Sequence, residues 1–206
     1  MRFGSWVFPI SQNSKNDGNV IDDTLIEIEK WESLGFDAIW LSEHHFDGAT
    51  AYADPVVFAA AIAQRTKHVR IGFAVVEMAL HHPVRLAAQV SLLDHLSKGR
   101  MMLGTGKGSA FNEYEYIGFG VPMSEAADSI SESEDIILKA WTGKPVAHKG
   151  KYWDVTFPEL RPLPFQKPHP PLLRACISRE STIEMGIKGR PVLIAAQENN
   201  SIKARL

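Results

Sequence analysis

The stretch GFDAIWLSEHHF at residues 35–46 contains the most informative pattern in the chain. Its glycine is typical of the end of a helix, and residues 37–43 form an apolar run of strand length. The run ends on Glu43, and His44 and His45 follow directly. In a parallel βα fold, reacting side chains gather at the carboxyl ends of the strands. The stretch therefore predicts the end of a helix, then a strand, then a candidate site.

On either side of this stretch, strand-like and helix-like segments alternate, which predicts right-handed βαβ units with parallel strands. We expect six strands, the first of them buried, at residues 2–8, 37–43, 69–76, 101–105, 172–177 and 192–196. We expect helices at residues 22–35, 56–66, 82–99 and 124–141, a short one from residue 181 and another beginning near residue 199. An antiparallel hairpin is expected at residues 145–155.

This order of elements favours an α/β fold of the TIM (β/α)₈ type, incomplete here, with about six of the eight βα units in a single domain over residues 1–206. A complete barrel needs roughly 250 residues. We therefore expect the chain to lack the C-terminal units, and Leu206 to end a fragment. An open barrel of this kind would have unpaired strand edges and an exposed interior.

The composition argues against several classes of protein. Of 206 residues, 45% are hydrophobic, and 22 Lys and Arg against 24 Asp and Glu give a formal charge of −2. This balance offers no basic surface for a nucleic acid or an anionic membrane. We expect no targeting segment and no membrane span, because the apolar runs are too short. The single cysteine, Cys176, argues against a disulfide framework and favours a cytoplasmic location.

The histidines are the clearest candidates for chemistry. A neutral imidazole can exchange a proton near neutral pH. Because adjacent strand residues point to opposite sides, we expect only one of His44 and His45 to face the site; the alternative is a hydrogen-bonded pair that closes a strand. His81 and His82 are interpreted mainly as the start of the helix that follows at Pro83. The first strand does not end in a His-x-His motif and no pair of carboxylates stands out at ligand spacing, so no metal site is predicted.

Two further segments could bind an anion. The turn at residues 104–108 places Lys107 among glycines, whose backbone N–H groups can approach an anion, although such turns also serve tight packing. Residues 178–181 precede a helix, and the free N–H groups of a helix N-terminus suit a phosphate. The same residues can form a plain helix cap. The residues alone leave both alternatives open.

Taken together, these segments resemble the bacterial luciferase-like, flavin-dependent monooxygenases, on the side of the catalytic subunit. The resemblance covers most of the chain and is strongest at residues 35–46, at HPVRLA (82–87) and at LLDHLSKGR (92–100). Residues 178–181 and the Gly189-x-Pro191 that follows are similar to the family's phosphate-binding turn. The resemblance implies a βα-barrel that binds reduced FMN (FMNH₂). Such enzymes react it with O₂ to form a C4a-peroxide, which oxidises a small organic substrate such as an aldehyde.

The resemblance also implies roles for individual residues. His44 matches the catalytic histidine, and Glu43 matches a residue that supports the flavin pocket. Ala74 and Val75 match the place where the family has a non-proline cis peptide beneath the flavin ring. All of these would lie around the isoalloxazine ring.

The flavin phosphate is expected to meet Lys107, with Glu180 and Ser181 completing its seat. Lys107 stands where the family commonly has an arginine, so a bidentate hold on the phosphate is lost. Gly106 stands where the luciferases have a reactive cysteine. The resemblance therefore does not imply light emission.

Partners follow from the same resemblance. A separate flavin reductase is expected because no nicotinamide-binding motif is present. The small residues 59–61 and the helix that begins at Pro83 resemble the family's dimer surface, which implies a homo- or heterodimer. Two alternatives stay open: a non-catalytic flavin-binding or partner subunit, and an oxidoreductase that uses the deazaflavin F420.

Overall fold

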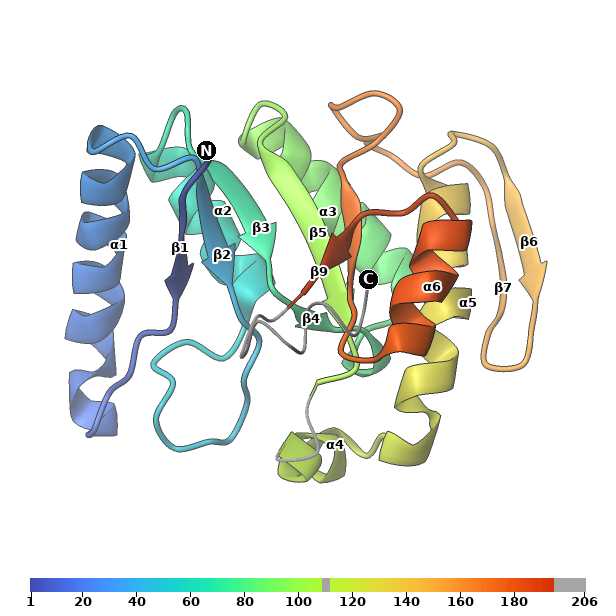
Figure 1. The fold of residues 1–206 in the computed structure, drawn as a ribbon, viewed down its shortest axis with the longest axis horizontal. Coiled ribbons are helices and arrows are strands. Elements are labelled where there is room, and N and C mark those ends of the chain that lie inside the picture. The colour runs from blue at the N-terminus through green and yellow to red at the C-terminus, as the bar shows by residue number, and fades with distance from the viewer. Residues whose placement is uncertain (109–111, 195–206) are drawn as a thin grey trace.

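The computed structural model describes residues 1–108 and 112–194, which form a parallel sheet with helices packed against it (Figure 1). Six parallel strands stand in the order β1-β2-β3-β5-β8-β9, which confirms the expected α/β fold with an incomplete barrel. Their bounds are Gly4–Val7 (β1), Ala38–Leu41 (β2), Arg70–Phe73 (β3), Met101–Gly106 (β5), Leu172–Ala175 (β8) and Val192–Leu193 (β9). The short strand β4 (Val76–Glu77) pairs with β5 beside this path.

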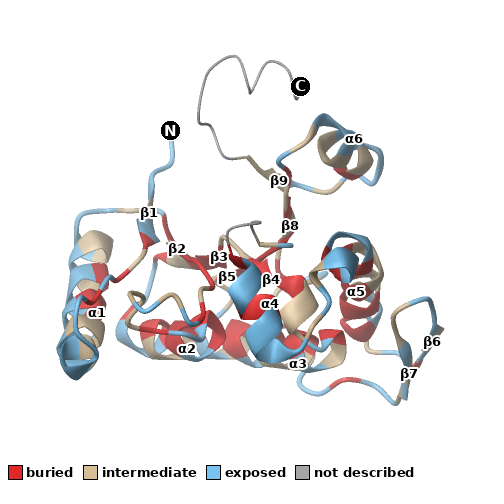
Figure 2. Ribbon diagram, turned by 90° about the horizontal axis from the view of Figure 1, so that it is seen from below, coloured by how far each residue is buried: buried red, intermediate tan, exposed pale blue. Residues whose placement is uncertain are grey.

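Four helices contact one another in sequence, α1 with α2, α2 with α3 and α3 with α5. Figure 2 shows α2 and α3 beneath the strands, on one face of the sheet. The strands β1 to β5 therefore have a helix-covered side and an opposite side that faces the barrel interior. The bounds are Asp17–Ser33 (α1), Pro55–Arg65 (α2), Pro83–Leu96 (α3) and Ala126–Ala140 (α5).

Smaller elements include α4 (Glu113–Phe119), α6 (Arg179–Ile187) and the hairpin of β6 (Val146–Lys149) with β7 (Asp154–Phe157). The hairpin is antiparallel, as predicted. Within the described ranges, no helix combines the length and apolarity needed to cross a membrane.

The predicted helix starts at two prolines are confirmed. The Asp54 side chain accepts the N–H groups of Val56 and Val57 at 2.8 and 3.0 Å, and Pro55 occupies the first turn of α2. Pro83 begins α3 in the same way, with His82 as its N-cap. Proline is favoured here because the first turn of a helix has no partner for its N–H groups.

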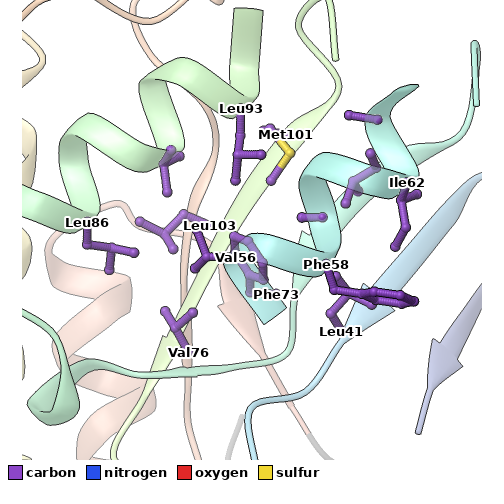
Figure 3. Close-up of a cluster of buried hydrophobic side chains, with 14 of the residues drawn as sticks. Leu41, Val56, Phe58, Ile62, Phe73, Val76, Leu86, Leu93, Met101 and Leu103 are labelled. Carbon is purple, nitrogen blue, oxygen red and sulfur yellow. The ribbon is translucent and has the colours of Figure 1, made fainter. Parts of the chain in front are cut away.

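The hydrophobic core lies between the sheet and the helices α2 and α3 (Figure 3). Its members come from alternate positions of β2, β3 and β5 and from the inner faces of the two helices; they include Leu41, Val56, Phe58, Ile62, Phe73, Leu86, Leu93, Met101 and Leu103. Ala59 belongs to this core and is fully buried. It therefore cannot form the small-residue dimer surface that was expected at residues 59–61.

The opposite face of the sheet is open, and this corrects the prediction of a buried first strand. Trp6 in β1 is 61% exposed and Ile177, just after β8, is 62% exposed. β1 is an edge strand with β2 as its neighbour, and the described residues provide no element that covers its inner face. The residues Gly4, Trp6, Trp40, Ala74 and Leu193 instead line an apolar cavity of about 390 Å³.

Several predicted boundaries were wrong. α1 begins at Asp17 rather than at residue 22, because the 3₁₀ turn Ser14–Asn16 runs directly into it. Leu34, expected on its apolar face, is exposed. α4 was not predicted, since seven residues are too few to show helical periodicity. Residues 195–196 of the expected last strand and the helix expected from residue 199 lie outside the described residues.

Candidate functional site

A cluster of buried carboxylates and imidazoles lies at the carboxyl ends of β2 and β4. Glu43 follows β2, Glu77 ends β4 and Glu115 lies in α4, and each of these three glutamates is at most 4% exposed. Buried carboxylates are costly unless they are hydrogen-bonded or paired with a positive group. The partners of each glutamate therefore decide its charge.

Glu43 is held as an ionised carboxylate by two histidines. His45 and His81 donate through Nε2 to Glu43 Oε1 at 2.8 and 2.9 Å. The N–H of Glu77 donates to Oε2 at 2.7 Å. Burial alone would raise the pKa of the Glu43 carboxyl, but the hydrogen bonds from His45 and His81 outweigh it and lower the pKa to about 2.

The charge of Glu43 acts in return on His81. Burial lowers the pKa of this imidazole, but the hydrogen bond and the negative charge of Glu43 outweigh burial and raise it. The prediction for the two histidines at residues 81 and 82 was therefore right for His82, which caps α3, and incomplete for His81.

His44 points away from Glu43 and has a different set of partners. Its side chain is 25% exposed, whereas that of His45 is 10% exposed. His44 Nδ1 lies 3.1 Å from Asn112 Nδ2 and 3.6 Å from Glu115 Oε1. Its ring meets the edge of Phe8, after β1, at 5.0 Å between centroids. Of the two neighbouring histidines, His44 is therefore the more exposed.

A second part of the site is a cavity of about 450 Å³ between the turn after β5 and the start of α6. It brings together four residues that the sequence analysis assigned to the cofactor: Val75, Lys107, Glu180 and Ser181. Arg174 of β8 also lines it. The walls of the cavity therefore carry two cationic side chains and a helix N-terminus, which suit a phosphate, together with the carboxylates of Glu180 and Glu184.

The start of α6 is a closed capping box. Ser178 Oγ accepts the N–H of Ser181 at 3.2 Å, and Ser181 Oγ accepts the N–H of Ser178 at 3.3 Å. The pKa of Glu180 is lowered by its own backbone N–H and by the Ser178 hydroxyl. Residues 178–181 thus form a helix cap, and they also lie on the wall of the cavity. The structure is therefore compatible both with a plain cap and with an anion-binding segment.

The peptide bond between Ala74 and Val75 is cis, as the resemblance implied. Ala74 and Val75 line the apolar cavity on the barrel interior. Val75 also lines the cavity of about 450 Å³ beside α6, here called the polar cavity. Gly106 faces this peptide: a Cβ added at Gly106 would lie 2.6 Å from Val75 Cγ2. The glycine at this position in the turn is therefore required by close packing.

Buried positive charge supports the wall of the polar cavity. Arg174 donates to the fully buried Glu134 at 2.6 and 2.7 Å, and Arg190 donates to the same carboxylate at 2.6 Å. Thr105 in β5 donates to it as well, at 2.6 Å. One buried carboxylate thus orients two guanidinium groups, and Arg174 keeps its place beside the cavity.

The two parts of the site meet at the glycine turn. A Cβ added at Gly108 would lie 2.4 Å from Glu77 Oε1, so the end of the turn packs against the carboxylate cluster. Tyr116 in α4 donates its hydroxyl to the carbonyl of Lys107. Glu43 and His44 therefore stand beside the cavity wall formed by Lys107 and Gly108 and are not themselves part of the cavity lining.

Four members of the cluster were not predicted from the sequence. His81 was set aside as part of a helix start, and Glu77, Asn112 and Glu115 were not considered. One signal for Glu77 was available, because it is a lone acidic residue in the otherwise apolar run of residues 74–80. Within the described residues, no group of three or more His, Cys, Asp or Glu side chains could hold a metal ion.

Comparison with known proteins places this arrangement in a family. The family described as luciferase-like monooxygenase matches residues 1–206. The chain belongs to this family. A flavin-dependent trigonelline monooxygenase, oxygenase component, from Acinetobacter baylyi is 31% identical over 84% of the chain and 48% of its own length. An F420-dependent glucose-6-phosphate dehydrogenase from Amycolatopsis mediterranei is 33% identical over 60% of the chain and 39% of its own length.

Among solved structures, the monooxygenase RslO1 from Streptomyces bottropensis superposes with a TM-score of 0.90. It is 27% identical, and the match covers the whole of this chain and 64% of that one. The chain spans about half the length of the curated relatives it matches first, 48% and 56%. The whole of this luciferase-like chain therefore shares the fold of part of that solved relative.

Proposed function

We propose that this luciferase-like chain provides the flavin-binding half of a monooxygenase that uses reduced FMN and O₂ to oxidise a small organic substrate. The observation that carries the proposal is the pair of adjoining cavities that share Val75, Ala175 and Ile177. The first is apolar and suits a flat ring. The second offers Lys107, Arg174 and a helix N-terminus to a phosphate, although Glu180 and Glu184 also line it. Their joint chemistry fits FMN.

Lys107 and the start of α6 would hold the phosphate. Lysine offers a point charge rather than a planar fork, so the hold is electrostatic and depends on salt. Arg174, oriented by Glu134, adds positive charge to the same wall. The Ser178 and Ser181 hydroxyls, which now bond to each other's backbone, lie at the edge of the cavity that the phosphate would enter.

Reduced FMN, when bound, supplies the electrons that activate O₂ for insertion into the substrate. The apolar walls formed by Trp6, Trp40 and Leu193 would keep water away from the ring. His44 would hold or move a proton, because it is partly exposed and has an amide and a carboxylate beside Nδ1. Glu43 would act through His45 and His81 rather than on the flavin itself, since it is almost completely buried.

Partners belong to the same proposal. The relative from Acinetobacter baylyi is named as an oxygenase component, and a separate reductase would supply reduced flavin here as well. An aldehyde is the substrate class that the resemblance to the luciferases implies. We also propose a dimer through α2 and α3, where Val57 and Leu92 are exposed; sedimentation at micromolar concentration that shows only monomer would contradict it.

An anaerobic titration with reduced FMN, followed by absorbance and fluorescence, tests the proposal directly. We expect saturable binding that weakens at least about tenfold in Lys107→Met, because a charge contact with phosphate is worth about 1.5–3 kcal/mol. Lys15→Met, which removes an exposed lysine before α1, serves as the matched control and should bind like the unchanged chain. Equal affinity of both variants would exclude Lys107 from the phosphate site.

Two other functions are distinguished by the same experiment. Tight binding of F420 with no binding of FMN would favour the F420-dependent oxidoreductase, a class to which one relative belongs. Stoichiometric binding of reduced FMN, with no oxidised product from any aldehyde in the presence of O₂, would favour a non-catalytic flavin-binding subunit. Product formation that depends on reduced FMN, O₂ and the substrate would support the monooxygenase.

A further inference from the structure

The carboxyls of Glu77 and Glu115 form a buried pair that the proposed flavin chemistry does not use. Glu77 ends β4 and Glu115 lies in α4, and both are at most 2% exposed. The amide of Asn112 lies 3.4 Å from Glu77 Oε1 and 3.3 Å from Glu115 Oε2, so the two carboxyls flank a single donor. Two buried carboxylates this close repel each other when both are ionised, and one proton on the pair removes that repulsion.

The surroundings decide which glutamate carries this proton. Glu115 accepts the N–H of His45 at 2.8 Å and the amide of Asn112 at 3.3 Å, and both bonds stabilise an ionised carboxylate. Glu77 Oε1 has only a longer contact with the Asn112 amide, at 3.4 Å, and its buried Oε2 meets no donor among the described residues. Glu77 is therefore the protonated member.

Burial and the neighbouring charges also favour the proton on Glu77. Burial is the largest cause that raises the pKa of Glu77, the bond to Glu115 and its charge add to it, and the pKa rises to about 9. The ionised Glu43 raises it further. Tyr116 also lies within the field of these carboxylates, but its hydroxyl is bonded to the carbonyl of Lys107.

The pair is linked to His44 through two groups that compete for the same nitrogen. Glu115 Oε1 lies 3.6 Å from His44 Nδ1, and Asn112 Nδ2 lies 3.1 Å from it. An ionised Glu115 attracts a proton to Nδ1 and leaves Nε2 able to accept one. If the amide of Asn112 donates instead, the proton must sit on Nε2. The charge on Glu115 therefore selects the tautomer.

We propose that Glu77 is a positioning residue that holds one proton against Glu115 and thereby sets the tautomer of His44. The proposal rests on the proposed role of His44 in proton transfer. With Glu77 neutral, the pair has a single negative charge, which faces His44 from α4, and Asp47 adds a second negative group near the imidazole. Loss of the proton from Glu77 would add a further charge and strengthen the hold on Nδ1–H.

The test is nuclear magnetic resonance of the folded chain with ¹³C-labelled glutamate carboxyls and ¹⁵N-labelled histidines. The Glu77 signal is identified by its loss in Glu77→Gln. Glu113→Gln, which removes an exposed carboxylate from the same helix, is the matched control. We expect the Glu77 carboxyl to titrate near pH 9, far above the ordinary value of about 4.3. A midpoint below pH 6 would overturn the proposal.

The ¹⁵N shifts of His44 give a second readout that a purely structural role would not change. Glu77→Gln should keep the neutral-pH tautomer, because glutamine also donates to Glu115, and should abolish the alkaline step in the His44 shifts. Glu115→Gln should move the proton from Nδ1 to Nε2, which exchanges the ¹⁵N shifts of the two ring nitrogens at neutral pH. Unchanged His44 shifts in both variants, with Glu113→Gln as reference, would overturn the proposal.

These measurements need neither flavin nor turnover. A chain that shows the alkaline Glu77 titration but binds no reduced flavin would leave the assignment of Glu77 standing and would overturn the proposed function. A chain that binds flavin while Glu77 titrates as an ordinary carboxyl would overturn the assignment of Glu77 and leave the proposed function standing.

Discussion

Replacement of Glu43 by glutamine should destabilise the fold strongly at neutral pH. Glu43 is almost completely buried and accepts hydrogen bonds from His45, His81 and the N–H of Glu77. Its pKa falls from 4.5 to about 2, which corresponds to roughly 3 kcal/mol at about 1.4 kcal/mol per pKa unit. Glutamine keeps the shape but loses the charge that holds both imidazoles. We therefore expect Glu43→Gln to lose about 3 kcal/mol of unfolding free energy at pH 7.

The pH dependence of this loss has a defined sign. The folded-state pKa of Glu43 is depressed, so its contribution is fully present above pH 4.5 and is lost as the pH falls towards 2. The difference between the unchanged chain and Glu43→Gln should therefore shrink over that window. The folded-state pKa of His81 is raised, so its contribution to the unfolding free energy is fully present below the ordinary pKa of 6.5. That contribution disappears as the pH rises through the raised pKa.

Urea unfolding followed by circular dichroism measures both effects. With an m value of about 2 kcal/mol per molar for a domain of this size, the midpoint at pH 7 should fall by about 1.5 M in Glu43→Gln. Glu27→Gln, which alters an exposed carboxylate in α1, should leave the midpoint within about 0.3 M. A loss below about 1 kcal/mol, or a loss that stays constant from pH 7 to pH 3, would show that the two histidines do not stabilise an ionised Glu43.

Two further substitutions test local packing and hairpin anchoring. Gly106→Ala places a Cβ 2.6 Å from Val75 Cγ2, and we expect a loss of about 1–3 kcal/mol in the same urea assay; a loss under about 0.5 kcal/mol would contradict the close packing. Glu132→Ala removes the acceptor for the N–H groups of Tyr152 and Trp153, so hydrogen exchange at both amides should accelerate at least about tenfold. Unchanged exchange would show that the hairpin is held by other contacts.

The carboxylate cluster and the polar cavity are separate in the sequence and adjacent in the fold. Glu77 packs against Gly108 at the end of the turn, and Tyr116 bonds to the carbonyl of Lys107. A ligand that moves the turn at residues 106–108 would therefore change the surroundings of Glu77. This contact gives a direct physical connection between the proposed phosphate site and the proposed proton-transfer residue.

Local patterns in the sequence were enough to predict the order of strands and helices and the sharper helix starts. Asp54 followed by Pro55 predicts a capped helix because both effects act within one turn. The positions of Lys107, Glu180 and Ser181 were also predictable, since each follows a predicted strand and parallel strands end at one edge of the sheet. All three line one cavity.

Tertiary structure alone decided the charges and the exposure. The exposure of Trp6 depends on what covers the edge of the sheet, and no property of residues 2–8 contains that information. The pairing of Glu77 with Glu115 joins β4 to a helix too short to be recognised from periodicity. Hydrogen-bond partners distant in the sequence set the pKa of a buried carboxyl, so an acidic residue that looks ordinary in the sequence becomes a proton-holding group only when the chain is folded.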